Sequence, residues 1–438
     1  MVTASQRGSI LFIKQAFLVL WLPVMLVPVA RAADETGSEA SVPSYLAERR
    51  KEQFESSPAY AVFPFPYALP GIGSGLSIVG GAMNIAGGYT DAYGIVYGGD
   101  VEGAAVGVSD IHIVPRRLIA DVGAGVLSKA SIQNFRQRGM SAAKDDFLLI
   151  DVDDAEYVGG RLTATFIERR IELYGAWYGG SSRLNSIRDK DGNVIVSAQG
   201  ASRQRSYTTM FGTRIDLTDD YDDPRRGMRF AMTRSASPPG DSGPDYAVMD
   251  YNLTAYLPFG SRNTWAFNFL RSDAIVSSMG ETDPVVIQSQ QGINCSDPAL
   301  TQQQQYCNDA VNLIVANNTY GTATTLGGFG RLRAYAQGRF RGAHTEFYGN
   351  EFRWNLTDEA RPFDLFIMKD IRTSLQVAVF YEIGSTADLR ADVGKTWRNS
   401  YGLGLRMITA SGLVFRGDVA DGHEGIATAI FIGYPWEL

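Results

Sequence analysis

Arginine is the residue type whose spacing has the clearest chemical consequence in this sequence. Residues 326–342, LGGFGRLRAYAQGRFRG, hold five glycines and four arginines in seventeen positions. Guanidinium groups this close repel one another unless carboxylates or phosphates surround them, and glycine lets a backbone fold tightly at small steric cost. We therefore expect a loop folded into a polar cavity, with acidic side chains of the cavity wall around its arginines. The alternative is a solvated basic loop.

Histidines and cysteines are too few for most catalytic or metal sites. The histidines are His112, His344 and His423, and none stands in a serine- or cysteine-based motif. Cys295 and Cys307 are twelve positions apart in a polar segment. In an oxidising compartment this spacing predicts a local disulfide, which stabilises a fold by on the order of 3 kcal/mol. We expect no enzymatic activity, no cofactor and no metal.

Two other segments resemble ligand loops only in part. Residues 71–75, GIGSG, lack the lysine and the following helix of a phosphate-binding loop. Residues 189–193 contain part of a calcium-loop pattern without its glutamate at the twelfth position. Because Asp191-Gly192 is a favoured tight-turn pair, we interpret this segment as a hairpin turn.

The N-terminus is typical of an export signal that is cleaved after residue 32. Arg7 and Lys14 accompany an apolar run over 16–29, and Ala30-Arg31-Ala32 fits a small-x-small cleavage site. A retained membrane helix is disfavoured because the run is short and contains prolines. Removal of residues 1–32 lowers the 40 basic residues to 37 against 47 acidic ones, a net charge of −10. An acidic exported chain without a basic aromatic face is not expected to bind nucleic acid.

Alternation of apolar and polar residues dominates 71–438 and indicates membrane-spanning strands. In outer-membrane barrels, successive side chains face lipid and lumen in turn. Only helices and closed barrels satisfy their backbone hydrogen bonds in lipid, and no later apolar run reaches the roughly twenty residues of a membrane helix. We predict an all-β fold, a transmembrane antiparallel β-barrel of about 16 strands.

The strands are expected at 75–85, 92–101, 104–114, 118–127, 147–152, 157–167, 171–178, 207–217, 228–233, 246–257, 265–271, 346–356, 373–384, 401–407, 413–419 and 427–434. Their polar, lumen-facing residues include Glu351, Glu382 and Arg406. The stretch 129–146 conflicts with this count, because it is long on the periplasmic side, where turns should be short.

Residues 33–70 are expected to form a short periplasmic leader that lies against or inside the barrel mouth. Residues 45–54 could form one charged helix, and Pro64, Pro66 and Pro70 impose an extended path. The leader is too short for a domain, because chains below about 40 residues rarely stabilise themselves.

Three sequence features resemble the BamA-like outer-membrane assembly and secretion barrels, the bacterial surface antigen superfamily. Residues 219–227, DDYDDPRRG, are similar to the acidic turn of that family, and residues 326–342 to its inward-folded sixth extracellular loop. Residues 379–384 and 402–406 are similar to its last strands. The resemblance spans most of 71–438. It implies an outer-membrane protein, in contact with lipid, that inserts or translocates unfolded protein clients together with a periplasmic partner.

The resemblance also assigns roles to individual residues. The loop motif consists of Gly327, Gly328, Arg331, Arg333, Tyr335, Gly338, Arg339 and Phe340. By the resemblance, Arg333 reaches into the lumen and pairs with Glu382 or, as second choice, Glu351; the alternative is that Glu382 is a solvated pore-lining acid. The acidic-turn motif consists of Asp219, Asp222, Pro224 and Gly227.

The sequence also departs from the family pattern. Ala334 stands where the loop motif has a glycine, and the chain ends at Leu438 rather than at an aromatic residue. Residues 33–70 leave no room for the repeated periplasmic transport (POTRA) domains of the family, so we expect a member without them.

The first expected strand, with Gly75, Gly80 and Gly81, should pair with the last strand near Tyr434. Glycine weakens strands and Pro435 cannot donate to a ladder, so this seam could open sideways and admit a client strand by edge pairing. The alternative is that the glycines permit barrel curvature. A passive outer-membrane pore for polar solutes is the competing function, because a polar lumen suits it equally.

Overall fold

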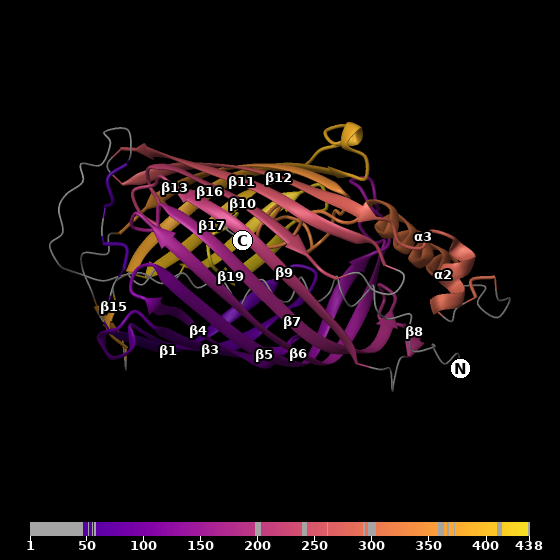
Figure 1. Ribbon diagram of the computed structural model, residues 1–438, viewed down its shortest axis with the longest axis horizontal. Coiled ribbons are helices and arrows are strands. Elements are labelled where there is room, and N and C mark those ends of the chain that lie inside the picture. The colour runs from indigo at the N-terminus through magenta and orange to yellow at the C-terminus, as the bar shows by residue number, and fades with distance from the viewer. Residues whose placement is uncertain are drawn as a thin grey trace.

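The computed structural model of the chain describes residues 47–436 except 51, 55, 57, 198–202, 239–242, 261, 292–293, 297–303, 358–362, 366–367, 372 and 410–413. The expected export signal lies outside the described residues. The main sheet has 17 strands, and 16 of them form a closed antiparallel ring because β8 (Val194–Ser197) pairs only with β7. Figure 1 shows the strands crossing the barrel at a tilt.

The barrel strands are β1 (Ala59–Leu69), β2 (Gly73–Met83), β3 (Asp91–Gly99), β4 (Glu102–Val114), β5 (Leu118–Phe135), β6 (Phe147–Phe166), β7 (Ile171–Arg188), β9 (Gln204–Asp216), β10 (Gly227–Ala236), β11 (Asp245–Phe259), β12 (Asn263–Ser278), β13 (His344–Asn355), β16 (Thr373–Ala387), β17 (Arg398–Thr409), β18 (Val414–Gly422) and β19 (Ala427–Ile432). Outside the ring are β14 (Phe363–Leu365), β15 (Met368–Ile371), the 3-10 turns η1 (Ile85–Gly87) and η3 (Arg390–Asp392), and the helices α2 (Pro284–Gln291) and α3 (Gln304–Tyr320).

Side chains alternate between the outside and the lumen along these strands. On β17, Leu403 and Leu405 are 59% and 58% exposed, whereas Arg406 is fully buried inside. The same contrast separates Trp354, which is 55% exposed, from Arg353 on β13. An apolar exterior around a charged interior is the pattern of a barrel in lipid. The predicted transmembrane barrel is therefore confirmed.

The expected number of about 16 barrel strands is confirmed. Two of the expected strand assignments were wrong. The first strand is β1, which lies within the segment expected to be a leader and pairs with β2 along its full length. The strands expected at 147–152 and 157–167 are one strand, β6, interrupted by an irregularity between Asp153 and Glu156. The expected boundary at residue 71 therefore lies inside the barrel.

The missed strand also explains the anomalous stretch 129–146. We call the end that carries residues 279–343 the loop end and the opposite end the turn end. With β1 counted, the connection between β5 and β6 falls at the loop end, where Gly139 N donates to Arg341 O at 2.8 Å. Long connections belong at that end of an outer-membrane barrel, so the conflict disappears.

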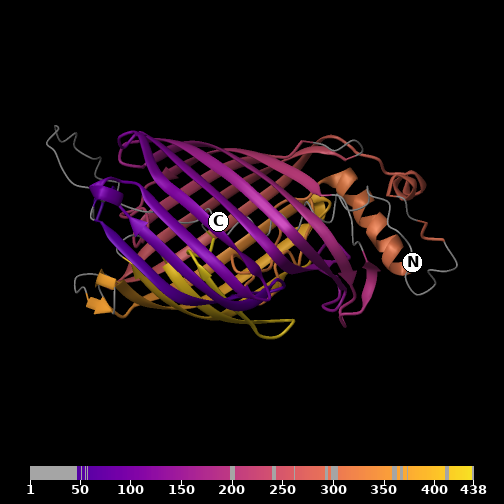
Figure 2. The same cartoon turned by 90° about the horizontal axis from the view of Figure 1, so that it is seen from below.

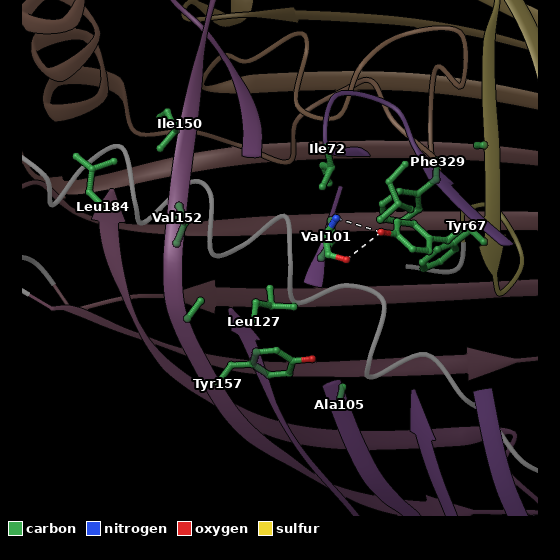
Figure 3. Packing of buried hydrophobic residues seen from close by; sticks show 14 residues of the cluster. Tyr67, Ile72, Val101, Ala105, Leu127, Ile150, Val152, Tyr157, Leu184 and Phe329 are labelled. Carbon is green, nitrogen blue, oxygen red and sulfur yellow. Dashed lines mark hydrogen bonds between the residues drawn. The ribbon is translucent and has the colours of Figure 1, made fainter. Parts of the chain in front are cut away.

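Tyrosines packed over glycines fill the lumen side of the first strands. Tyr157 lies against Gly125 of the neighbouring strand, where an added Cβ would approach the ring to 2.3 Å. Tyr67 on β1 accepts a hydrogen bond from Val101 N at 3.1 Å and packs in the cluster that Figure 3 shows with Tyr157. The glycine-rich strands thus make room for large rings inside the wall.

A helical hairpin projects from the loop end, at the right of Figures 1 and 2. Cys295 and Cys307 form the predicted disulfide there. It packs with Ile287, Val311 and Ile314 in a hydrophobic cluster of the hairpin itself. Within the described ranges, no helix has the length and apolar character needed to cross a membrane.

Candidate functional site

Residues 326–342 fold back into the lumen, as the sequence predicted. Leu326 and Phe340 exchange backbone hydrogen bonds of 2.9 Å, which close the base of the loop. Gly327 adopts φ +102°, and an added Cβ would lie 2.3 Å from Ala336 O. The turn therefore requires glycine at this position. Gly328 and Gly338 have positive φ as well, and Tyr335 and Phe340 are buried.

Arg333 lies inside the barrel against the wall of β13, β16 and β18 and is fully buried. Its Nε donates to Glu382 Oε1 at 2.9 Å and its backbone N–H to Glu382 Oε2 at 3.0 Å. Its Nη2 reaches Glu351 Oε2 at 3.2 Å, and Nη1 reaches Asp418 Oδ2 at 2.9 Å. The structure thus contains both expected partners and a third, Asp418. The guanidinium also stacks on Phe380, with Cζ 3.4 Å from the ring centroid.

Two of the three carboxylates around Arg333, Glu351 and Asp418, also pair with arginines of the wall. Arg406 Nη1 donates to Glu351 Oε1 at 2.6 Å, and Arg353 Nε donates to the same oxygen at 2.8 Å. Arg416 Nη1 lies 3.1 Å from Asp418 Oδ2. The alternation of apolar and polar residues in the sequence predicted that these wall residues face the lumen. Only the fold shows that they form one hydrogen-bonded network. Glu382 and Glu351 are therefore not solvated pore-lining acids.

The other motif arginines anchor the loop at separate points. Arg339 donates to Glu424 at 2.7 Å and to Ala142 O at 2.7 Å, which joins the loop to two loop-end connections. Arg331 donates to Trp436 O at 2.9 Å. Burial lowers the pKa of Arg331 to about 10, against the opposing effect of Asp250. No arginine of the motif is solvent-exposed, so the solvated-loop alternative is wrong.

The C-terminal tail is the part of this site that sequence reasoning missed. Trp436 is fully buried in the lumen, and its Nε1 donates to Glu382 Oε1 at 2.9 Å. Asn252 Nδ2 donates to Trp436 O at 2.7 Å. The indole fills the space beside Gly349, where an added Cβ would come within 2.5 Å of it. The aromatic residues near the chain end were noted, but no sequence signal placed them against the loop.

The acidic turn lies at the turn end, between β9 and β10. Asp219 Oδ1 accepts hydrogen bonds from the backbone N–H groups of Arg225 and Arg226 at 2.8 and 2.9 Å. Burial raises the pKa of Asp219, and these two N–H groups oppose the shift. Gly227 adopts φ +105°, and an added Cβ would lie 2.3 Å from Leu217 O, which is too close for any other residue. Asp222 and Pro224 are buried in the same turn.

The segment expected to be a leader binds to this acidic turn. Arg49 Nη1 lies 3.3 Å from the buried Asp216 Oδ2. Arg50 donates its backbone N–H to Asp219 O at 2.6 Å and its Nη2 to Asp223 O at 2.7 Å. The described residues of 47–54 therefore lie against the turn end of the barrel. In the described part of 45–54 no helix forms, so the expected charged helix is wrong there.

The seam of the barrel is the contact between β1 and β19, and it is short. Among the described residues, Ala68 and Ile430 are the one pair of register partners across it. The tail turns away from the wall at Gly433, which has φ +116° and donates to Val414 O at 2.7 Å. The tail then continues into the lumen, where Tyr434 donates its hydroxyl to Asp223 Oδ1 at 2.8 Å.

Aromatic rings lie along β1 where this pairing is missing. Phe415 on β18 packs against Phe63 and Phe65 of β1, with ring centroids 5.0 and 5.3 Å apart. Pro64 and Pro66 lie between and beyond these rings. Because proline has no N–H, it fits a paired strand only where its nitrogen faces the unpaired edge. The turn-end part of the seam is therefore closed by side-chain packing.

The residues assigned to the seam lie elsewhere. Gly75, Gly80 and Gly81 belong to β2, which pairs with β1 and β3 rather than with the last strand. At Gly75 an added Cβ would meet Gly98 O at 2.1 Å and Tyr67 Oη at 2.7 Å. Gly75 therefore provides room for the Tyr67 side chain. The assignment of these glycines to the seam was wrong, because β1 went unrecognised.

The three histidines lie apart from one another. His112 packs between Phe54 and Tyr89 at the turn end. His344 Nδ1 lies 2.8 Å from Asp273 Oδ1 on β12, and His423 donates its backbone N–H to Tyr335 Oη at 3.2 Å.

No protein-family model and no curated protein matches the sequence. Among solved structures, BamA from Haemophilus ducreyi lacking POTRA domains 1-3 is similar with 13% identity and a TM-score of 0.44, over 96% of this chain and 76% of that chain. CdiB from Escherichia coli has 11% identity and a TM-score of 0.49, over 88% and 66% of the two chains. CdiB from Acinetobacter baumannii has 11% identity and a TM-score of 0.41, over 88% and 63%.

Proposed function

We propose that this chain is a BamA-like barrel of the outer membrane and that it assists the insertion or translocation of other proteins through the seam between β1 and β19. The single register pair at this seam carries the proposal. By contrast, β1 and β2 share eleven register pairs. Because each backbone hydrogen bond contributes about 0.5–1.5 kcal/mol net, the seam is the boundary of the barrel that opens at least cost.

Two features support an opening that leaves the rest of the wall intact. The Arg333 network joins the lumen loop to β13, β16 and β18 through Glu351, Glu382 and Asp418. Breaking a buried ion pair by removing one partner costs roughly 3–5 kcal/mol. Separation of β1 from β19 breaks none of these contacts. The wall therefore stays rigid while the seam opens.

The prolines of β1 restrict how a client pairs with this edge. A strand added along β1 can donate to the carbonyls of Pro64 and Pro66 but receives no N–H from either residue. Strand addition therefore depends on the seam edges outside this stretch. No catalytic step is part of the proposal. The outer-membrane lipid, an unfolded protein client and a separate periplasmic partner are its proposed partners.

A reversible disulfide across the seam tests the proposal. Ala68→Cys with Ile430→Cys joins the one register pair, and the native cysteines do not interfere because they are already bonded to each other. In cells that depend on this protein, we expect the oxidised variant to lose client assembly or secretion and the reductant to restore it. Ala255→Cys with Phe267→Cys, on the fully paired β11 and β12, is the matched control.

Full activity of the oxidised seam variant would overturn the proposal. The passive-pore alternative makes a different prediction for the same protein. A pore keeps its single-channel conductance when the seam is closed, and its conductance does not change when residues 326–342 are deleted. Conductance and client assembly are therefore measured on the same variants.

A further inference from the structure

A groove of about 870 Å³ lies on the wall formed by β4, β5, β6, β7 and β9. Its outward-pointing side chains are apolar and between 46% and 61% exposed: Val106, Val126, Val158, Trp177 and Tyr207. Small residues form its floor: Ala104, Ala124 and Gly179. The Trp177 indole lies over Gly179, where an added Cβ would come within 2.9 Å of it. The missing side chains create a hollow in a wall that is otherwise covered by large apolar residues.

The loop-end rim of this groove is polar and carries more positive than negative charge. Ser181 is the register partner of both Glu156 and Arg205. Arg203 Nη1 lies 2.6 Å from Glu156 Oε2 and 2.9 Å from Ser181 Oγ. Arg205 is exposed, and within the described ranges it forms no ion pair. Two guanidinium groups therefore face one carboxylate at this rim.

The order of these residues along the strands matches the order of groups across a lipid leaflet. Trp177 lies four residues before Ser181 on β7, and Tyr207 lies two residues after Arg205 on β9, so both aromatic residues are on the turn-end side of the charged rim. Trp and Tyr side chains collect where the hydrocarbon meets the headgroups. The apolar floor therefore faces acyl chains, and Arg203 and Arg205 lie at headgroup height.

We propose that this groove binds one membrane lipid with an anionic, phosphate-bearing headgroup. An acyl chain occupies the floor between Val126, Val158 and Trp177, and the phosphate oxygens accept hydrogen bonds from the guanidinium groups of Arg205 and Arg203. Guanidinium groups suit this role because their planar fork matches the geometry of a phosphate. The volume lies within the range of about 300–1,000 Å³ that small-molecule sites have.

Three observations favour a lipid over other occupants. The groove faces the membrane, where a soluble phosphate does not reach the apolar floor. Each of its five strands is paired on both sides, so the groove offers no open edge to which a protein strand could add. The excess of arginine over carboxylate at the rim attracts an anionic headgroup rather than a zwitterionic one. The proposal does not depend on the function of the seam.

Native mass spectrometry of the full-length protein in detergent tests this site. Phosphatidylglycerol and phosphatidylcholine with identical acyl chains are added separately, and inorganic phosphate is added in a third arm. We expect one phosphatidylglycerol molecule to be retained per barrel, at least tenfold more often than phosphatidylcholine. Retention of inorganic phosphate alone, or equal retention of the two lipids, would overturn the proposal.

Two variants locate the lipid. Ala124→Leu fills the floor, and Arg205→Glu reverses the charge of the rim without entering the wall. Each is expected to reduce phosphatidylglycerol retention at least tenfold. The matched controls are Ala255→Leu on β11 and Arg234→Glu on β10, which lie outside the groove. Unchanged retention in Arg205→Glu, or equal loss in its control Arg234→Glu, would place the lipid elsewhere and refute the site.

Discussion

Trp436 donates its indole N–H to Glu382 Oε1 at 2.9 Å, and this oxygen also accepts the Nε–H of Arg333. One carboxylate therefore binds both the lumen loop and Trp436. The tail that would otherwise extend β19 along β1 is bound inside the barrel. Trp436 thus joins the end of β19 at the seam to the lumen network through Glu382.

Trp436→Phe is expected to weaken this arrangement. Phenylalanine keeps an apolar ring beside Gly349 but loses the donor to Glu382, and a hydrogen bond to a charged group contributes about 1.5–3 kcal/mol. The temperature at which the folded band disappears in heat-modifiability gels should fall. Trp354→Phe is the control, because Trp354 faces outward. Equal melting of Trp436→Phe and the wild type would show that the indole hydrogen bond is not important for stability.

Arg333→Ala is expected to destabilise the barrel more than any other single arginine substitution. It leaves Glu382 and Asp418 without their central cation, and loss of one partner of a buried pair costs roughly 3–5 kcal/mol. Arg333→Lys should restore only part of the stability, because an ammonium group cannot reproduce the planar fork that reaches several carboxylates. Heat-modifiability and the amount of folded protein in the membrane are the measurements.

The control for Arg333 is Arg390→Ala. Arg390 is an exposed arginine at the loop end that pairs with Asp273, and exposed pairs contribute about 0–1 kcal/mol. If Arg333→Ala reached normal membrane levels and melted like Arg390→Ala, the network would have no structural role.

Arg49→Ala is expected to loosen the attachment of the segment around it to the turn end without unfolding the barrel, because the contacts of Arg50 remain. Asp216 keeps a second partner, Arg229 Nη2 at 3.2 Å, so its buried carboxylate stays paired. Limited digestion with proteinase K followed by mass spectrometry should show faster cleavage within the segment. Glu48→Ala provides the control because Glu48 is exposed. Identical cleavage in the two variants would mean that the ion pair does not hold the segment.

Replacement of both cysteines by serine is expected to loosen the hairpin alone. The disulfide closes a loop of twelve residues and contributes roughly 3 kcal/mol to local stability. The buried residues of the hairpin form their own cluster, separate from the cluster around Leu332 and Trp436. Proteolysis within 284–320 should accelerate while the heat-modifiability midpoint stays the same. A lower midpoint would show that the hairpin supports the barrel.

The barrel itself was predictable from the sequence, because alternation is a local property of each strand. Within one strand, alternation alone predicts that Leu403 and Leu405 face outward and that Arg406 faces the lumen. The same dependence on alternation explains the errors. Asp154 has φ +49° within an irregularity of β6, where the alternation is interrupted and one strand looks like two. The strand β1 was not predicted because it contains Pro64 and Pro66, and proline is compatible with a strand only at an edge.

The lumen loop was also predictable, since glycines and arginines at close spacing demand a tight turn and buried acids. The partners of Arg333 were only partly predictable, because alternation shows that a side chain faces the lumen but not how far along the barrel it lies. Asp418 and Glu382 approach the same guanidinium through the stagger of strands around the ring. Trp436 and Glu382 are separated by 54 positions and share no pattern. The sequence by itself determined a lipid-embedded barrel with an inward arginine loop. Only the tertiary structure placed Trp436 inside the barrel and left the seam with one register pair, because register between distant strands is a property of the closed ring.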